Sequence, residues 1–320
     1  MSRTFALSIE QLPRVLRDSV TVAYLLFRVS DCIEDHPDME PARKAELLRL
    51  WNEVLCGSSP VRQLTDAVAG LDGSDPEVFV AQQANLLMDQ LQSLPEEIQA
   101  TILKHVRETS LGMARWQEHG PQVGDEDEMD DYMHHVAGLV GYLVTDIFAW
   151  YLPGLRSRKH ELMPLAREFG LALQTVNVIR GLRKDWERGW VFVPRSYCEK
   201  VGLTPAQLFD PAHRESAMQV VDMLALKAER HLKQGVAYIT ALPRRHHRIR
   251  LACMWPLFFA AKTLAVSRNN TGVLRSEAKI GRDQVALIVR STTVFGWSNH
   301  WLRWYYRHLT VSEKALPQPS

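Results

Sequence analysis

The sequence lacks several features that would assign a function quickly. It contains only four cysteines in 320 residues, at positions 32, 56, 198 and 253, and none forms a C-x-x-C pair. Such spacing gives neither a zinc-ligand pattern nor a disulfide framework, and it suits a reducing compartment. The formal net charge is +1, so no overall field favours nucleic acid or an acidic partner. We therefore expect no nucleic-acid partner.

Long hydrophobic runs are also missing. The longest, LACMWPLFFAA at 251–261, ends at Lys262, and Asp146 interrupts the apolar stretch at 136–152. A membrane-spanning helix needs about 20 apolar residues. The first residues have no apolar signal core, so they read as mature protein. We expect a soluble, cytoplasmic protein whose contact with a membrane, if any, is peripheral.

Alternating patterns typical of strands are scarce, whereas apolar residues recur with the helical period along most of the chain. Turn-forming stretches lie between the periodic segments. The predicted helices cover 8–33, 40–56, 60–69, 77–91, 95–115, 127–151, 160–186, 205–240, 244–267 and 283–305. The sequence therefore predicts an all-α fold in a single domain over 1–310, with a disordered tail at 311–320.

Two charged runs precede or open helices. The acidic run DEDEMDD at 125–131 is explained by negative charge at a helix N-terminus, which favours the helix dipole. The basic run RRHHRIR at 244–250 has two interpretations, a solvated helix face or a site for anionic lipid or phosphate.

The stretch FRVSDCIEDHPDM crowds three carboxylates, Asp31, Glu34 and Asp35, into five positions. On a helix, Tyr24, Arg28, Asp31 and Asp35 share one face. Apolar residues spread around the rest of that helix, so the polar face is expected to line an internal cavity. Carboxylate ligands at this spacing suit Mg²⁺. The alternative is a solvated acidic helix end stopped by a proline.

A second polar line runs along LQTVNVIRGLRKDWERGWVFVP, where Gln174, Asn177, Gly181 and Asp185 step by three or four. Cations flank it at Arg180, Arg183 and Lys184. This helix and the acidic one could enclose a Mg²⁺-diphosphate. The alternative is a polar network that holds two core helices in register.

A third stretch, DDYMHHVAGLVGYLVTDIF, combines small residues with a phenol. Ala137, Gly138 and Gly141 permit close approach of another helix or of a ligand, and Tyr132 lies on the face leading to them. The phenol serves either chemistry or packing as an aromatic with a hydrogen-bonded tip.

Together these segments resemble the squalene and phytoene synthases. The matching segments, in family order, are SRTFA (2–6), YLLFRVSDCIED (24–35), YMHHVAGLVG (132–141), QTVNVIRGLRKD (174–185), CMWPLFFAAKTLA (253–265) and RNNTGVLRSEAKIGRDQ (268–284). The last segment leans toward squalene synthases.

The resemblance implies an isoprenoid-synthase-type helical bundle around a central cavity, forming one head-to-head synthase domain over 1–310. It also implies a Mg²⁺-dependent, NADPH-linked prenyltransferase that condenses two farnesyl diphosphates through presqualene diphosphate to squalene. A monomer is favoured, with isoprenoid diphosphate as the ligand.

Site roles carry over residue by residue. The implied metal ligands are Asp31, Glu34, Asp35, Asn177 and Asp185. The implied catalytic residues are Tyr132, Asp31, Asp35 and Asp185. The implied substrate-binding residues are Arg3, Tyr24, Arg28, Gln174, Asn177, Arg180 and Lys279.

The sequence departs from the family at three positions. Gly181 stands where an aspartate is usual, Lys184 where an acid is common, and Gly281 where an arginine is usual. The alternatives are therefore a phytoene synthase, a partial-reaction synthase that makes presqualene diphosphate or hydroxysqualene, or a non-catalytic isoprenoid-binding paralogue.

Overall fold

The computed structural model describes residues 2–310, with side chains from position 5 onward. Helices form nearly all of the regular structure in that range, and a single isolated parallel bridge, Gln122 with Val191, is the only strand-like pairing there. The predicted all-α fold is confirmed. The tail predicted at 311–320 lies outside the described residues.

The described chain forms two compact units. The first unit contains 2–13, 121–138 and 161–310, and the second contains 14–120 and 139–160. The chain passes from one unit to the other after Pro13, Gly120, Gly138 and His160. The predicted domain limits stay a prediction.

In the second unit, the long helices α2 (Arg14–Asp35) and α7 (Glu96–His119) both pack along α3 (Pro41–Cys56). Its helices are α2 (Arg14–Asp35), α3 (Pro41–Cys56), α4 (Val61–Val68), α5 (Pro76–Gln82), α6 (Ala84–Gln92), α7 (Glu96–His119), α9 (Leu139–Tyr151) and α10 (Pro153–Arg156). Trp51 of α3 and Ile102 of α7 are fully buried. The hydroxyls of Ser30 and Ser110 are 2.8 Å apart and join α2 to α7. The apolar contacts and this polar pair fix the orientation of α2.

Local sequence explains where α3 begins and ends. Pro41 occupies the first turn, where a missing N–H costs nothing. Gly57 ends the helix in the left-handed conformation (φ 74°), and its N–H bonds to the carbonyls of the last turn.

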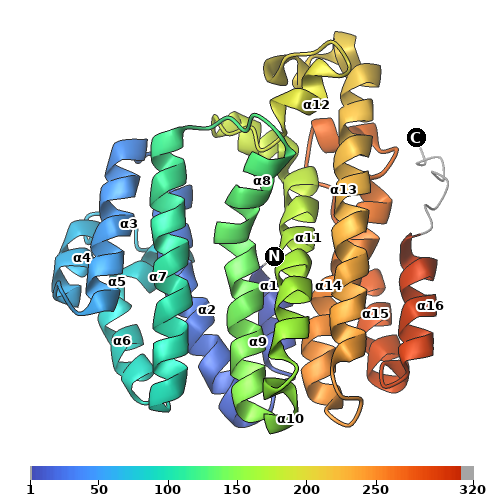
Figure 1. Cartoon of the computed structure of the whole chain (residues 1–320). Helices are drawn as coiled ribbons and strands as arrows, with labels where there is room; N and C mark the ends of the chain where they lie inside the picture. The colour runs from blue at the N-terminus through green and yellow to red at the C-terminus, as the bar shows by residue number, and fades with distance from the viewer. Residues whose placement is uncertain (1, 311–320) are drawn as a thin grey trace. The chain divides into compact units, whose positions relative to one another are not determined.

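The first unit is organised around α11, α13 and α14 (Figure 1). Its helices are α1 (Ser2–Ile9), α8 (Glu126–Met133), the π-helical turn η1 (His134–Gly138), α11 (Lys159–Glu187, from Glu161 onward), α12 (Arg195–Glu199), the 3₁₀ turns η2 (Pro205–Phe209), η3 (Pro211–His213) and η4 (Thr271–Leu274), α13 (Arg214–Ala241), α14 (His247–Ser267), α15 (Arg282–Phe295) and α16 (Asn299–Thr310). Gly235 of α13 lies against Phe169 of α11 and Leu257 of α14, so these three helices meet closely.

Several predicted helices are interrupted. The helix predicted at 8–33 is two helices, because Pro13 lacks an N–H and α2 begins just after it. The segment predicted at 205–240 starts with two 3₁₀ turns, and those predicted at 77–91 and 283–305 break at Gln83 and Gly296. Helical periodicity continues across these breaks, so it does not reveal them.

The core helix α14 is long and apolar enough to cross a membrane by length and composition alone. In the structure, 83% of the most apolar 18-residue stretch of this helix is buried. Burial of that extent is expected of a helix at the centre of a helical unit.

Candidate active site

The acids of α2 divide between two environments. Asp31 and Asp35 lie one turn apart, and the side chain of Asp31 is 29% exposed whereas Asp35 is open to solvent. Glu34 is buried, at 9% exposure. The ammonium of Lys44 donates to the backbone carbonyl of Glu34 at 2.8 Å, which ties the end of α2 to α3. The face that the sequence predicts is therefore made chiefly by Asp31 and Asp35.

Arg28 connects this face to α5. Its Nη1 donates to Oδ2 of Asp31 at 2.9 Å, and its Nη2 forms an ion pair with Glu77. One guanidinium therefore serves two carboxylates. Glu77 was not predicted from the sequence, because its pairing joins positions far apart in the chain.

The pKa of Asp31 is raised to about 6. Burial is the main cause, since it disfavours the charged form, and the neighbouring Asp35 adds to it. The hydrogen bond and charge of Arg28 act in the opposite direction but do not outweigh burial. Among the described residues, the arginine beside Asp31 therefore does not offset its burial and its acidic neighbour.

This donor set fits a hard divalent cation. Mg²⁺ prefers oxygen ligands and is commonly held by one or two carboxylates together with substrate phosphate. No group of three His, Cys, Asp or Glu side chains that could hold a metal ion occurs among the described residues. Asp31 and Asp35 can therefore offer two ligands, and substrate oxygens or water would have to supply the rest.

Two of the predicted ligands on α11 already make side-chain contacts, although the contact of Asn177 uses its nitrogen and not its oxygen. The amide of Asn177 donates to Oε1 of Gln174 at 3.1 Å, and Arg188 donates to Oδ1 of Asp185 at 2.6 Å. A Cβ built at Gly181 would lie 3.4 Å from Oδ2 of Asp185, an ordinary contact distance. A side chain at position 181 would thus lie beside Asp185. As it stands, this part of α11 fits a metal ion less well than α2 does.

Glu277, an acid that was not predicted from the sequence, forms ion pairs with both Arg180 of α11 and Lys279. Nη2 of Arg180 is 3.8 Å from one Glu277 oxygen, and Nζ of Lys279 is 2.5 Å from the other. The hydrogen bond from Lys279 lowers the pKa of Glu277, and the charges of Arg180 and Lys184 assist. The structure therefore brings Arg180, Lys184 and Lys279 together around one carboxylate.

The buried Nε of Arg180 has no hydrogen-bond partner. A buried N–H without an acceptor is costly, and a phosphate oxygen would satisfy it. This arrangement fits an anionic ligand such as diphosphate.

Tyr132 lies at the end of an aromatic stack. It is 4% exposed, and its ring stacks on Phe192 with centroids 4.5 Å apart. Phe192 in turn stacks on Trp190 at 5.4 Å. Stacked π faces attract positive charge, so this group of rings suits a carbocation.

The backbone just after Tyr132 is held tightly against α11. The π-helical turn η1 follows α8, and a Cβ built at Gly170 would lie 2.4 Å from the carbonyl oxygen of Ala137. The hydroxyl of Thr175 is 3.3 Å from the sulfur of Met133. The expected close approach at Ala137 and Gly138 is confirmed, and its partner is α11.

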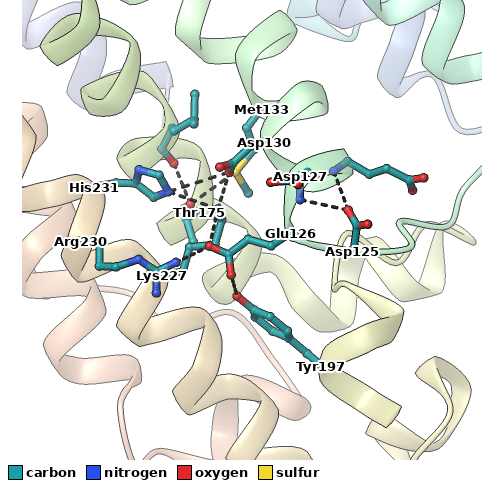
Figure 2. A network of polar contacts seen from close by, with 12 residues as sticks. Asp125, Glu126, Asp127, Asp130, Met133, Thr175, Tyr197, Lys227, Arg230 and His231 are labelled. Carbon is teal, nitrogen blue, oxygen red and sulfur yellow. Dashed lines mark hydrogen bonds and ion pairs between the residues drawn. The ribbon is translucent and has the colours of Figure 1, made fainter. Parts of the chain in front are cut away.

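A charged network also fixes α8 (Figure 2). Lys227 of α13 is fully buried, and its ammonium contacts Asp130 directly and Glu126 at 3.5 Å. Arg230 and the hydroxyl of Tyr197 also bind Glu126. Figure 2 shows these side chains converging on Glu126 from two other elements.

This network changes the interpretation of the acidic run. Asp125 does cap α8, accepting from the N–H groups of Asp127 and Glu128. Glu126 and Asp130 instead pair with cations of α13. Burial opposes ionisation of Glu126, but Tyr197, Lys227 and Arg230 together keep its pKa below the ordinary value.

The remaining predicted residues are only partly located. Tyr24 is half-buried on α2. Arg3 falls within α1, but its side chain lies outside the described part of the structure. The joining of the α2 and α11 groups in one cavity stays a prediction, as do the site roles.

Comparison with known proteins gives consistent matches. A model of the squalene/phytoene synthase family matches residues 1–284. The Botryococcus squalene synthase of Botryococcus braunii is 31% identical over 302 residues, which cover 91% of this chain and 61% of that protein. The squalene synthase of Homo sapiens is 27% identical over 298 residues, covering 91% and 67%. The chain thus spans only about three fifths of the length of the Botryococcus protein.

Solved structures share the fold. A ligand complex of TcSQS has a TM-score of 0.82 at 23% identity, covering 99% of this chain and 90% of that chain. A dehydrosqualene synthase, also with a ligand, has a TM-score of 0.65 at 18% identity, covering 92% of each chain.

Proposed function

Because the chain belongs to the squalene/phytoene synthase family, we propose that it condenses two farnesyl diphosphates head to head, through presqualene diphosphate, to squalene. The family membership predicted from six sequence segments is confirmed. The observation that carries the proposal is the Asp31–Asp35 face of α2, where burial and a neighbouring acid disfavour the charged form of Asp31 more than Arg28 stabilises it. A metal bound to substrate diphosphate would correct that imbalance.

In this proposal Asp31 and Asp35, with Glu34, bind Mg²⁺, and Asn177 and Asp185 provide further oxygen ligands. When bound, Mg²⁺ supplies positive charge that helps diphosphate to leave. The guanidinium groups of Arg3, Arg28 and Arg180 and the amine of Lys279 bind diphosphate oxygens.

Tyr132 has the central chemical role. Loss of diphosphate from the donor leaves an allylic cation, which the double bond of the second substrate attacks. The phenol of Tyr132 assists the ionisation by donating its proton to the leaving diphosphate, and the phenolate so formed accepts the proton whose loss closes the cyclopropane. The stacked rings of Phe192 and Trp190 support this role, because they offer π faces to a cation while excluding water. Tyr24 and Gln174 line the substrate pocket.

A partial-reaction synthase is the second candidate, and the family departures favour it. Conversion of presqualene diphosphate to squalene needs a hydride, and NADPH is the proposed donor. Lys279 resembles a lysine that lies near the diphosphate and nicotinamide site in this family. Here it is engaged by Glu277, and position 281 carries no side chain where an arginine is usual. These features bear on the reductive half and leave the first condensation intact.

The deciding experiment supplies the purified chain with farnesyl diphosphate and Mg²⁺, with and without NADPH, followed by lipid extraction and mass spectrometry. Squalene that appears only with NADPH supports the full reaction. A cyclopropyl diphosphate or a C30 alcohol in both samples supports the partial reaction.

The same assay with geranylgeranyl diphosphate tests the phytoene-synthase alternative. A folded protein that turns over neither the C15 nor the C20 diphosphate would overturn the proposal in favour of a non-catalytic isoprenoid-binding protein. Activity in the cytoplasm, as a monomer, is part of the same proposal, and sedimentation of the purified chain measures the oligomeric state.

A further inference from the structure

Two connections of the first unit lie together at one end of its helices. They are the link between α13 and α14 and the turn between α15 and α16 (Figure 1). Nε2 of His247 is 3.0 Å from the backbone oxygen of Thr293, which joins the two segments directly. We call the surface formed by residues 243–248 and 287–308 the basic aromatic tip.

Large apolar side chains of the tip face solvent. Phe295 is 51% exposed, Trp297 58% and Trp304 50%. On α15, Leu287 and Val294 are about 60% exposed and lie two turns apart on one face. A group of large exposed apolar side chains on neighbouring segments indicates an interaction site.

Two of the exposed rings, Phe295 and Trp304, belong to a continuous aromatic array. Phe295 contacts Trp301 with centroids 5.7 Å apart, and Trp301 stacks on Tyr305 at 4.6 Å. Trp304 lies at 6.3 Å from Tyr305. The array therefore runs from the end of α15 across α16. Tryptophan and tyrosine are the residues enriched at the interface between lipid and water.

The charge of the tip has one sign. No aspartate or glutamate occurs between Gln284 and Thr310, or in the link at 241–250. Exposed arginines occur throughout these segments, at Arg244, Arg245, Arg248, Arg290, Arg303 and Arg307. The whole chain carries a formal charge of only +1, so this is a local concentration of positive charge.

A buried arginine keeps the tip rigid. Arg250 is fully buried, so it is no part of the solvated face considered for the run at 244–250. Its guanidinium donates to the carbonyls of Leu242 (2.9 Å) and Gly296 (3.3 Å) and to Oδ1 of Asn299 (2.7 Å). Both connections are thus bonded to one group. Phe295 and Trp297, on either side of Gly296, are presented outward without an ordering cost on binding.

We propose that the basic aromatic tip docks the protein on an anionic lipid bilayer. Its aromatic residues insert at the level of the head groups, while the surrounding arginines pair with lipid phosphate and carboxylate. The lack of any acid in the tip segments is the charge complementarity that favours a bilayer over a protein partner. The inference rests on the proposed function in one respect, that an isoprenoid substrate and a hydrocarbon product both partition into lipid.

The test is co-sedimentation of the full chain with vesicles of phosphatidylcholine, with or without phosphatidylserine. We expect at least about tenfold stronger binding to the anionic vesicles. The double variant Phe295→Ala/Trp297→Ala should weaken that binding about tenfold. The double variant Arg244→Gln/Arg245→Gln should weaken it and reduce its dependence on salt.

Phe79→Ala is the matched control, because Phe79 is 55% exposed but lies in α5 of the second unit. It should bind vesicles like the parent chain, and circular dichroism checks that every variant folds. Equal binding to neutral and anionic vesicles, or unchanged binding by the aromatic double variant, overturns the proposal. So does a parent chain that does not bind vesicles but forms dimers abolished by that variant, since the tip would then join two copies.

Failure of the proposed function is a separate outcome. Vesicle binding needs no turnover, and turnover of farnesyl diphosphate is measured without vesicles.

Discussion

Asp31 on α2 and Glu126 on α8 are acids of similar exposure whose pKa values are shifted in opposite directions. Their side chains are 29% and 35% exposed. Burial raises the pKa of Asp31 to about 6, whereas the pKa of Glu126 lies below its ordinary value. Burial opposes ionisation at both sites, but it prevails over the neighbouring cations only at Asp31.

The partners explain it. Asp31 shares a single arginine, Arg28, with Glu77, and a second acid lies one turn away. Glu126 is bound by Arg230 and a tyrosine hydroxyl and also by Lys227, which it shares with Asp130. An acid already neutralised by the chain holds the fold together, and an acid left short of positive charge is available to bind a cation. From this comparison we expect Glu126 to be a structural carboxylate and Asp31 to be a functional one.

The largest expected effect is on turnover. Asp31→Asn should reduce the rate about a thousandfold, because it removes the charge that the proposed Mg²⁺ requires. It should leave the melting temperature at pH 7 unchanged or higher. Release of pyrophosphate and thermal unfolding measure the two quantities. Asp38→Asn, at an exposed acid just beyond α2, is the control, and a sharp fall in melting temperature for Asp31→Asn would make Asp31 structural.

The matching test of the network should show the opposite pattern. Lys227→Met leaves Glu126 and Asp130 short of a buried cation and should lower the free energy of unfolding by about 3 kcal/mol. Urea denaturation measures this. Lys233→Met, at an exposed position of the same helix, should change the unfolding midpoint little. Equal midpoints for the two variants would contradict a stabilising role for Lys227.

The pH dependence of stability should distinguish the two acids, because removing the charge of Asp31 should stabilise the fold and removing that of Glu126 should destabilise it. The folded-state pKa of Asp31, about 6, lies above the ordinary 3.8, so its charged form destabilises the fold at neutral pH. Asp31→Asn should therefore be more stable than the parent at pH 7.5 by about 1–2 kcal/mol. That advantage should shrink as the pH falls through 6, because the parent then binds a proton.

Glu126 should behave in the reverse sense. Its pKa is lowered from 4.5, so the stability that it contributes is present above pH 4.5 and is lost as the pH falls below that value. Glu126→Gln should be less stable than the parent by a constant amount between pH 7.5 and 5. Urea denaturation at several pH values measures the free energy of unfolding of both variants. If both substitutions changed it in the same direction at pH 7.5, the distinction between the two acids would be wrong.

The smallest expected effect is at Gly181. Gly181→Asp places a carboxylate beside Asp185 and should strengthen the Mg²⁺ dependence of turnover and of thermal stability by about fivefold. Gly154→Asp adds the same charge on α10, where a new Cβ meets no neighbour within 4 Å. An identical metal response from both variants would mean that position 181 does not face the metal.

Local features of the fold were predictable from sequence. The helix predicted at 40–56 is α3, from Pro41 to Cys56, because a proline begins it and a glycine ends it. The break at Gln83 and the 3₁₀ turns before α13 were missed, since the hydrophobic period runs through them. The presence of helices follows from periodicity, but their interruptions depend on tertiary packing.

The candidate residues of the site were predictable from the sequence, but most of their ion-pair partners were not. The motifs identify Asp31, Tyr132 and Arg180 as candidate residues. They do not reveal that Glu277 joins Arg180 to Lys279, because that acid lies in a separate segment with no regular spacing to α11. Lys227 likewise pairs with an acid 97 positions away. Such long-range partners become visible only when the chain is folded.

The close packing at Gly170 limits how the products of this enzyme could be changed by mutagenesis. Because even a methyl group there would collide with the carbonyl of Ala137, added bulk cannot be absorbed by a neighbouring rotamer. The π-helical turn itself would have to shift, and Tyr132 stands only two residues before it. Mutagenesis libraries that vary position 170 would thus reposition the phenol as a side effect, and such variants should be judged on catalysis as well as on cavity size.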